Sequence, residues 1–220
     1  MNLPVFPSRP SCRTCARWEQ APVNPGVPTI QWGLPGPGHP VLVVVGVTPK
    51  FFDHQHNEPF RGKPGDLVRS VYLANLSNLC TIYLTLLVRC GPDLPAKAAD
   101  FKSCFAHHLD DLHQILAAHP DDPVHILLLG APATTHFHRH HLGIRLTQKD
   151  GFSQNGKQRI IQSRPVSVFS TFHPGDVLRS NSLIHPVEDH MTLLESHVKN
   201  ERRAATDPDI QPPRSPHNLP

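Results

Sequence analysis

The chain has no apolar run long enough to cross a membrane, and residues 1–9 hold two prolines in place of the apolar core of a secretory signal. We therefore expect a cytoplasmic protein without membrane contacts, in a compartment that does not favour disulfides. Strong charge of either sign is also lacking, because 21 Lys and Arg against 18 Asp and Glu give a formal net charge of +3. This weak basic bias is compatible with a nucleic-acid partner but does not require one.

Proline, in contrast, is abundant. The 220 residues include 25 prolines, which gather toward the two ends of the chain and in loops. They predict an extended N-terminal segment at 1–40, which carries a CxxC pair, and a disordered tail at 204–220. The middle, 41–203, is expected to form one α/β domain, since a hydrophobic content of 38% is enough for a real core.

Apolar patterning predicts the elements of this domain. Strands are predicted at 41–45, 81–88, 125–129, 159–161 and 166–171, and helices at 65–78, 96–118, 132–140 and 187–203. Strands that alternate with helices indicate a three-layer α/β/α fold with a central, mostly parallel four-stranded sheet. Ligands of such sheets bind beyond the carboxyl ends of the strands, so the loops that begin at 46, 89 and 173 are the candidate site.

Four of the five cysteines form two pairs. Cys12 and Cys15 form the CxxC pair, whereas thirteen residues separate Cys90 from Cys104. The short first pair aims two thiolates at one centre, and a fold can bring the second pair to it. Spacing alone leaves a metal centre, zinc included, two disulfides or coincidence open. The fifth, Cys80, starts a predicted buried strand and is expected to be a core thiol.

Two loops beyond the carboxyl ends of the predicted strands carry side chains that suit contacts with a nucleic-acid base. GVTPKFFDHQHNEPFRG at 46–62 contains the carboxylate of Asp53, and Phe60 offers a stacking platform within a polar loop. FHPGDVLR at 172–179 places His173 where it can donate a hydrogen bond to a developing anion. Two apolar residues of that segment, at 177 and 178, have no obvious core to fill. Taken singly, each pattern is also that of an ordinary surface loop.

Together these segments resemble the iron-sulfur branch of the uracil-DNA glycosylase superfamily, closest to its fourth and fifth families. The loop at 46–62 is similar, without a gap, to a motif with a GEAPG-like start, an acidic residue and a PFVG-like end. YLTLLVRC, which ends at Cys90, resembles the strand before the third cluster cysteine, and Cys104 falls at the fourth. LLLGA at 127–131 resembles the LGxxA turn, and His-Pro at 173–174 the closing HP motif. The resemblance covers most of the chain.

The resemblance implies a monomeric DNA glycosylase that flips a nucleotide out of DNA and hydrolyses its N-glycosidic bond, leaving an abasic site. It implies catalytic roles for Asp53 and His173, base contacts from Gly46, Val47, Thr48, Phe60 and Leu86, DNA contacts from Val177, Leu178 and Arg179, and a [4Fe–4S] cluster on Cys12, Cys15, Cys90 and Cys104. Phe60 would stack on the base, and His173 would stabilise the negative charge that it gains. Asp53 would orient water or stabilise the cationic sugar. The cluster would have a structural role.

Two positions depart from the fourth-family pattern. Val47 stands where that pattern has glutamate, and Leu86 where it has the asparagine that reads the edge of uracil. An apolar wall discriminates by only about 10- to 200-fold, against ~10⁴ for a polar one, so a broader or different substrate is expected. Uracil and other damaged pyrimidines would indicate DNA repair. A bulky hypermodified phage base, such as glucosylated hydroxymethylcytosine, would indicate antiviral defence, and a non-catalytic DNA-binding protein is the third alternative.

A cluster of histidines lies between these motifs. His136, His138, His140 and His141 have no nearby carboxylate and do not all share one helical face. We interpret them as a solvated cluster that faces DNA, with a metal site as the alternative.

Overall fold

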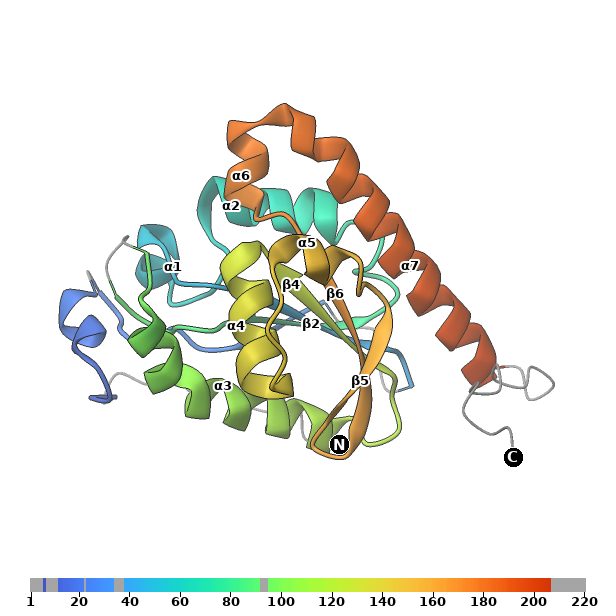
Figure 1. Ribbon diagram of the computed structural model, residues 1–220, viewed down its shortest axis with the longest axis horizontal. Coiled ribbons are helices and arrows are strands. Elements are labelled where there is room, and N and C mark those ends of the chain that lie inside the picture. Colours follow the sequence, from blue (N-terminus) through green and yellow to red (C-terminus); the bar gives the residue numbers. More distant parts are fainter. Residues whose placement is uncertain (1–5, 7–11, 22, 34–37, 92–94, 207–220) are drawn as a thin grey trace.

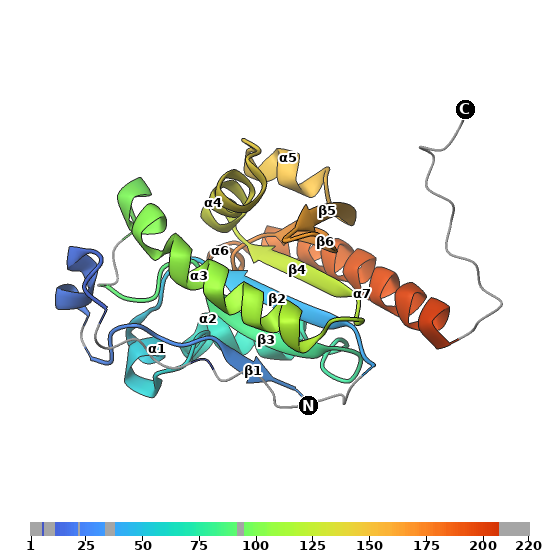
Figure 2. The same ribbon diagram turned by 90° about the horizontal axis from the view of Figure 1, so that it is seen from below.

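The computed structural model describes residues 6, 12–21, 23–33, 38–91 and 95–206, and it shows helices on both faces of one sheet (Figures 1 and 2). The strands are β1 (Ile30–Trp32), β2 (Val41–Gly46), β3 (Thr81–Leu86), β4 (Val124–Leu129), β5 (Lys157–Ile161) and β6 (Arg164–Thr171). The helices are α1 (Phe51–His56), α2 (Gly62–Leu67), α3 (Ala98–Ala118), α4 (Ala131–Leu142), α5 (Gln148–Phe152), α6 (Pro174–Arg179) and α7 (Ile184–Thr206), with short turns η1 (Ala16–Gln20), η2 (Val68–Tyr72) and η3 (Asn181–Leu183). The predicted three-layer α/β/α class is confirmed.

The sheet has the strand order β1-β3-β2-β4-β6-β5. Its four central strands run parallel, and β1 and β5 pair antiparallel to them at the edges. The predicted number of four strands is therefore wrong, because the described residues form six. The strand β1 gave no sequence signal, since it is three residues long and pairs through backbone groups that any extended chain presents.

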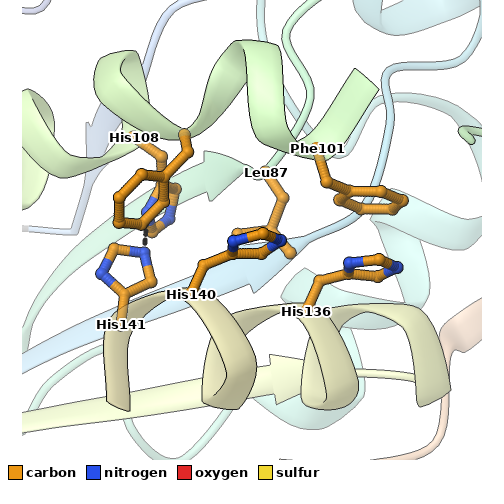
Figure 3. A pocket seen from close by; sticks show the side chains of 7 residues that line it. Leu87, Phe101, His108, His136, His140 and His141 are labelled. Carbon is orange, nitrogen blue, oxygen red and sulfur yellow. Dashed lines mark hydrogen bonds between the residues drawn. The ribbon is translucent and has the colours of Figure 1, made fainter. Parts of the chain in front are cut away.

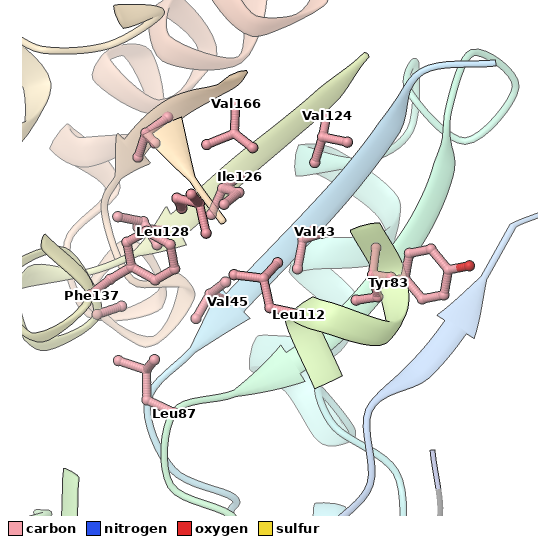
Figure 4. Packing of buried hydrophobic residues seen from close by; sticks show 14 of the residues in the cluster. Val43, Val45, Tyr83, Leu87, Leu112, Val124, Ile126, Leu128, Phe137 and Val166 are labelled. Atoms are coloured by element: carbon pink, nitrogen blue, oxygen red, sulfur yellow. The ribbon is translucent and has the colours of Figure 1, made fainter. Parts of the chain in front are cut away.

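The side chains of the central strands alternate between two apolar layers. The odd-numbered residues of β2 face α3 and α4, and its even-numbered residues face η2 and α7. Figure 4 shows the first of these layers, in which Val43 and Val45 lie near Leu112 of α3 and Phe137 of α4. All six residues of β2 are buried because helices cover both faces, which is why this strand is apolar without alternation.

The helix predicted at 65–78 has a different form. It begins at Gly62 as α2, widens into the π-helical turn η2, and gives way to turns after Tyr72. The hydroxyl of Tyr72 donates a hydrogen bond to the carbonyl of Phe172 at 3.1 Å, so this segment is tied to the loop before α6. Figure 1 shows α6 beside α2. The other predicted helices are present, with small shifts at their ends.

The four parallel strands end at the same edge of the sheet. Gly46 lies opposite Leu86, and Leu129 lies opposite Thr171. The loops that follow β2, β3, β4 and β6 therefore gather at one place, as the sequence predicted. No helix in the described ranges is long and apolar enough to cross a membrane. Part of the predicted N-terminal segment and most of the predicted C-terminal tail lie outside the described residues.

Candidate functional site

The buried carboxylate of Asp53 closes the loop after β2. Its Oδ2 accepts the backbone N–H of Lys50 at 2.7 Å, and its Oδ1 accepts that of Arg61 at 2.6 Å, so one side chain joins both ends of the loop. Burial raises the pKa of Asp53, and the two backbone hydrogen bonds lower it in part. A carboxylate offers about four acceptor sites. The loop therefore uses only part of the hydrogen-bonding capacity of Asp53.

The ring of Phe60 lies against Gly46 and Leu86, at the carboxyl ends of β2 and β3. A Cβ atom on Gly46 would come within 2.8 Å of both side chains, so only glycine leaves room for this contact. Phe60 has a φ of 59°, which strains a bulky residue, and the side chain of Arg69 holds it by donating to its carbonyl oxygen. Three of the predicted base contacts thus meet at one point of the sheet edge.

The other two predicted base contacts, Val47 and Thr48, follow β2 directly and are partly buried. The carbonyl of Val47 accepts the N–H of Val88 at 2.9 Å, which extends the pairing of β2 with β3 beyond the strands themselves. The side chain of Val47 lies against the apolar layer that α3 and α4 cover. Val47 therefore joins the loop to the core.

Gly65 of α2 lies against the carbonyl group of Phe60, with no room for a side chain. In an open helix, a change from glycine to alanine stabilises by about 1 kcal/mol. We expect the opposite sign here: Gly65→Ala should lose about 1–3 kcal/mol in the free energy of unfolding, because the methyl group must push the Phe60 backbone aside. Urea unfolding measures this, with Lys63→Ala on the same helix as the control. A Gly65→Ala variant as stable as the wild type would contradict this geometry.

The imidazole of His173 caps α6 and is held in one orientation by the backbone. Its Nδ1 accepts the N–H of Gly175 at 3.0 Å. A neutral imidazole that accepts at Nδ1 carries its proton on Nε2, so Nε2–H is the available donor. Gly130, which follows β4, lies so close that a Cβ atom there would be 2.8 Å from the Cβ of His173. The turns after β4 and β6 together fix the position of this donor.

The surroundings of His173 keep its imidazole neutral. Burial lowers its pKa; Asp176 raises it in part, and Lys50 and Arg179 lower it further. A proton on Nδ1 would also displace the hydrogen bond from Gly175. The effect of Lys50 places the loop after β2 within electrostatic range of His173. This edge of the sheet thus presents a neutral N–H donor, which suits an oxygen atom on which negative charge develops.

The remaining residues of α6 divide between core and solvent. Val177 is 4% exposed and lies in the apolar layer that α7 covers, so the expectation that it has no core to fill is wrong. Leu178 is 49% exposed. Arg179 is exposed and pairs with Asp176 on the same helix. Leu178 is thus the apolar side chain that α6 presents to solvent, and Arg179 adds a positive charge beside it.

The structure brings the four predicted ligand cysteines together. None of the five cysteines, all of which belong to the described residues, forms a disulfide. Burial raises the pKa of Cys90 to about 12, and the neighbouring thiols of Cys104, Cys15 and Cys12 contribute to this rise. Cys80 is not part of this group. It is buried in the apolar layer that α7 covers, which confirms the prediction of a core thiol. One cysteine group therefore joins the segment before η1, the loop after β3 and the first half of α3.

The spacing of these sulfurs does not match that of thiolates on a single zinc ion. Zn–S bonds of about 2.3 Å place tetrahedral thiolates about 3.8 Å apart. No three of the cysteine sulfurs, all of which belong to described residues, lie within 4.8 Å of one another. The backbone N–H groups of Gly26 and Arg89 donate to Cys90 and Cys104 respectively. Such hydrogen bonds to sulfur are a feature of iron-sulfur sites, and four thiols are the donor set that such a centre takes.

A buried ion pair that positions Cys90 was missed by sequence reasoning. Arg89, directly before Cys90, pairs with Asp111 of α3. The hydroxyl of Thr29 donates to the same carboxylate at 2.6 Å. Arg89 and Asp111 are both nearly fully buried, so each depends on the other for neutralisation. The sequence signal that could have revealed this pair is the position of Arg89, a charged residue between an apolar strand and a cysteine.

His136, His140 and His141 of α4 face α3, as Figure 3 shows. His136 stacks on Phe101 with ring centroids 3.6 Å apart, and Nε2 of His141 lies 3.0 Å from Nδ1 of His108. Burial lowers the pKa of His136, and it lowers that of His141 to about 3. His138 is 1% exposed. The expectation of a solvated histidine cluster is therefore wrong, because three of the imidazoles lie in the contact between two helices and the fourth, His138, is buried.

Comparison with known proteins gives a family. No curated protein matches this chain. A family model described as the uracil DNA glycosylase superfamily matches residues 34–194, which is more than half of the chain. The match includes the four parallel strands and the loops that carry Asp53 and His173, but it does not include Cys12 and Cys15. The chain belongs to the uracil DNA glycosylase superfamily.

Proposed function

We propose that this protein is a DNA glycosylase that flips a damaged or modified pyrimidine nucleotide out of DNA and hydrolyses its N-glycosidic bond. Superfamily membership supports a DNA glycosylase type of activity, with DNA as the partner. The observation that carries the proposal is the neutral, backbone-held imidazole of His173, which lies within electrostatic range of the loop that Asp53 closes. The order of events is flipping, hydrolysis and release, because the stacked base is inaccessible in a duplex.

The chemistry requires one hydrogen-bond donor and one oriented water molecule. Hydrolysis breaks the bond between the base nitrogen and C1′ of the sugar; the water oxygen bonds to C1′, and the departing base takes up a proton. Negative charge collects on a base oxygen during this step, and Nε2–H of His173 stabilises it. The acceptor sites of Asp53 that the loop leaves free orient the water or stabilise the positive charge on the sugar.

Phe60 and Leu86 form an apolar surface against which the flipped base would bind. Leu86 is 2% exposed and cannot form a hydrogen bond through its side chain, so position 86 does not read the edge of the base. We propose uracil or a related damaged pyrimidine as the substrate, acted on in DNA repair. The apolar side chain at position 86 also favours a second candidate, a bulky hypermodified pyrimidine such as glucosylated hydroxymethylcytosine, whose excision would serve antiviral defence.

A [4Fe–4S] cluster on Cys12, Cys15, Cys90 and Cys104 is part of the proposal. When bound, the cluster would supply iron–thiolate bonds between parts of the chain that are distant in sequence. The adjoining thiols and the two backbone N–H donors support this assignment. We expect a structural role, with the reaction carried by the chain's own residues at the sheet edge.

A panel of modified oligonucleotides tests the proposed function. Iron-loaded protein is incubated with duplexes that contain uracil, hypoxanthine or glucosylated hydroxymethylcytosine, and alkali then cleaves any abasic site. We expect cleavage with uracil or with glucosylated hydroxymethylcytosine, the two pyrimidines of the panel, and none with the unmodified duplex. Intact strands with every base, together with retained DNA binding, would instead support a non-catalytic DNA-binding protein.

The pH dependence of excision should have an acidic limb above pH 3.8. His173 must be neutral, and its pKa lies below its usual value of 6.5. Asp53 must be ionised, and its pKa lies above its usual value of 3.8. The rate should therefore fall as the pH drops, with a midpoint set by the higher of these two pKa values. Single-turnover rates across the range measure this, and a rate that stays level down to pH 3.8 would count against a requirement for ionised Asp53.

The exposed Leu178 should matter for duplex DNA. Leu178→Ala is expected to slow excision from a duplex about tenfold and from a single strand much less, because only a duplex has a gap to fill after flipping. Single-turnover rates on matched duplex and single-stranded substrates measure the difference. Ile160→Ala, at a 66% exposed position on the edge strand β5, is the control. Equal losses on the two substrates would show that Leu178 does not fill the gap.

A further inference from the structure

Three metal-binding side chains meet at the opposite end of the strands from the loops described above. They are His125 of β4, and His197 and Glu201 of α7. Nε2 of His125 lies 3.2 Å from Oε2 of Glu201, and Nε2 of His197 lies 3.2 Å from Oε1 of the same carboxylate. All three ligand atoms lie within 4.8 Å of one another.

The sequence periodicity explains this meeting. His197 and Glu201 are four residues apart on α7, so they share one face of the helix. Along β4, His125 lies on the same side as Leu127 and Leu129, which belong to the apolar layer that α7 covers. Ser167, opposite His125 on β6, places its hydroxyl 3.1 Å from Nε2 of His197. A strand and a helix thus hold the group from two directions.

The buried imidazole of His125 is poorly satisfied by its neighbours. Its side chain is fully buried, and neither ring nitrogen makes a hydrogen bond of good geometry among the described residues. Its Nε2 does lie at ion-pair distance from Glu201. Buried polar atoms in proteins are nearly always paired, and a metal ion shared with Glu201 would bind Nε2 directly.

We propose that His125, His197 and Glu201 bind a divalent transition-metal ion, for which zinc is the best match. Imidazole nitrogen and carboxylate oxygen bind zinc at about 2.0–2.2 Å. Each imidazole lies 3.2 Å from a different oxygen of Glu201, and one ligand atom from each of the three residues falls within the 4.8 Å that a single ion can span.

The site is open to solvent on one side. The side chains of His197 and Glu201 are 31% and 27% exposed, and Glu201 and Ser167 line an open groove between the start of β4 and the start of β6. Three protein ligands leave the fourth position of the ion to water. The ion ties the C-terminal half of α7 to the sheet. Its effect is therefore expected on stability.

This site is separate from the proposed excision site. His125 lies five residues before the turn at Gly130, a distance of about 16 Å along the strand. His125 and His197 also adjoin neither the four thiols nor the loop that holds His173 in their described contacts. Failure of metal binding here would leave base excision untouched, and failure of excision would leave this site untouched.

Zinc content tests the proposal, with Zn²⁺ alone as the probe. Iron-loaded protein is freed of loosely bound metal with a chelator, given Zn²⁺, desalted, and analysed for zinc and iron per chain. His197→Ala should retain one zinc fewer than the wild type at equal iron content, with at least ~100-fold weaker affinity, since even outer partners of a metal site contribute 10- to 100-fold. His185→Ala, which removes an exposed histidine from the same helix, should match the wild type.

A second variant keeps the test decisive if His197→Ala does not fold. Glu201→Gln keeps the size of the side chain and removes the charged ligand. Zn²⁺ should raise the melting temperature of the wild type but not that of Glu201→Gln. Equal zinc content, or an equal shift in melting temperature, in the wild type and in both variants would overturn the proposal and leave an ion-pair cluster in its place.

Discussion

His173→Ala should reduce the rate of base excision by about 10²- to 10³-fold, the range typical of losing one donor to a developing anion. The reason is geometric: Nδ1 accepts from Gly175, so Nε2–H is the donor that this residue offers. Single-turnover kinetics on a duplex measure the chemical step without product release. Binding of the same duplex should change little, because the hydrogen bond strengthens only as charge develops.

The same imidazole also caps α6, so the prediction needs a variant that separates the two roles. Alanine removes an N-cap acceptor and should cost about 1 kcal/mol of stability. His173→Asn keeps an acceptor that suits an N-cap but removes the imidazole donor. We expect Asn to restore stability and leave the rate low. Recovery of the rate with Asn would show that capping, rather than the Nε2–H donor, is what excision needs.

Cys104→Ser should lose iron and sulfide and lower the melting temperature by at least about 10 °C. The cluster is expected to join α3 to the segment before η1, and the free energy of metal binding is then part of the free energy of folding. Serine has nearly the same shape as cysteine, so little of the effect comes from packing. Elemental analysis and thermal unfolding of the same preparation measure both changes.

Cys80→Ser is the matched control for this change. Cys80 is a fully buried thiol in the α7-side apolar layer. Its replacement buries a hydroxyl and should lower stability by about 1–3 kcal/mol, but iron and sulfide should stay at the wild-type level. A Cys104→Ser protein with full iron content would contradict the assignment of Cys104 as a ligand.

The central strands were predictable from the sequence because burial on two faces demands apolar residues at every position, as along β2. The edge strand β1 was not, because its pairing depends on backbone groups. Val177 was misjudged for a related reason. Its apolar neighbours come from α7 and from strands that are distant in sequence, so its burial was visible only once these elements were placed.

The candidate site was predictable in its residue types but not in its geometry. The loop motifs indicated Asp53, Phe60 and His173, whereas the proton position on His173 depends on the backbone of Gly175. The hydrogen bonds that hold the cysteine group in place could not be predicted from the sequence either. Arg17 of η1 donates from Nε to the carbonyl of Cys90, 73 residues away, at 3.2 Å. Contacts at such separations leave no periodic pattern in the chain.

The central claim is that this chain hydrolyses the N-glycosidic bond of a pyrimidine nucleotide in DNA. Mass spectrometry of the intact substrate strand tests it most directly, because excision replaces the base with a hydroxyl group and leaves the backbone whole. With a duplex that carries the right modified pyrimidine, we predict conversion to the abasic mass by the wild type and at most trace conversion by His173→Ala in the same time. An unchanged strand mass with every modified base, from iron-loaded protein that still binds the duplex, would contradict the claim.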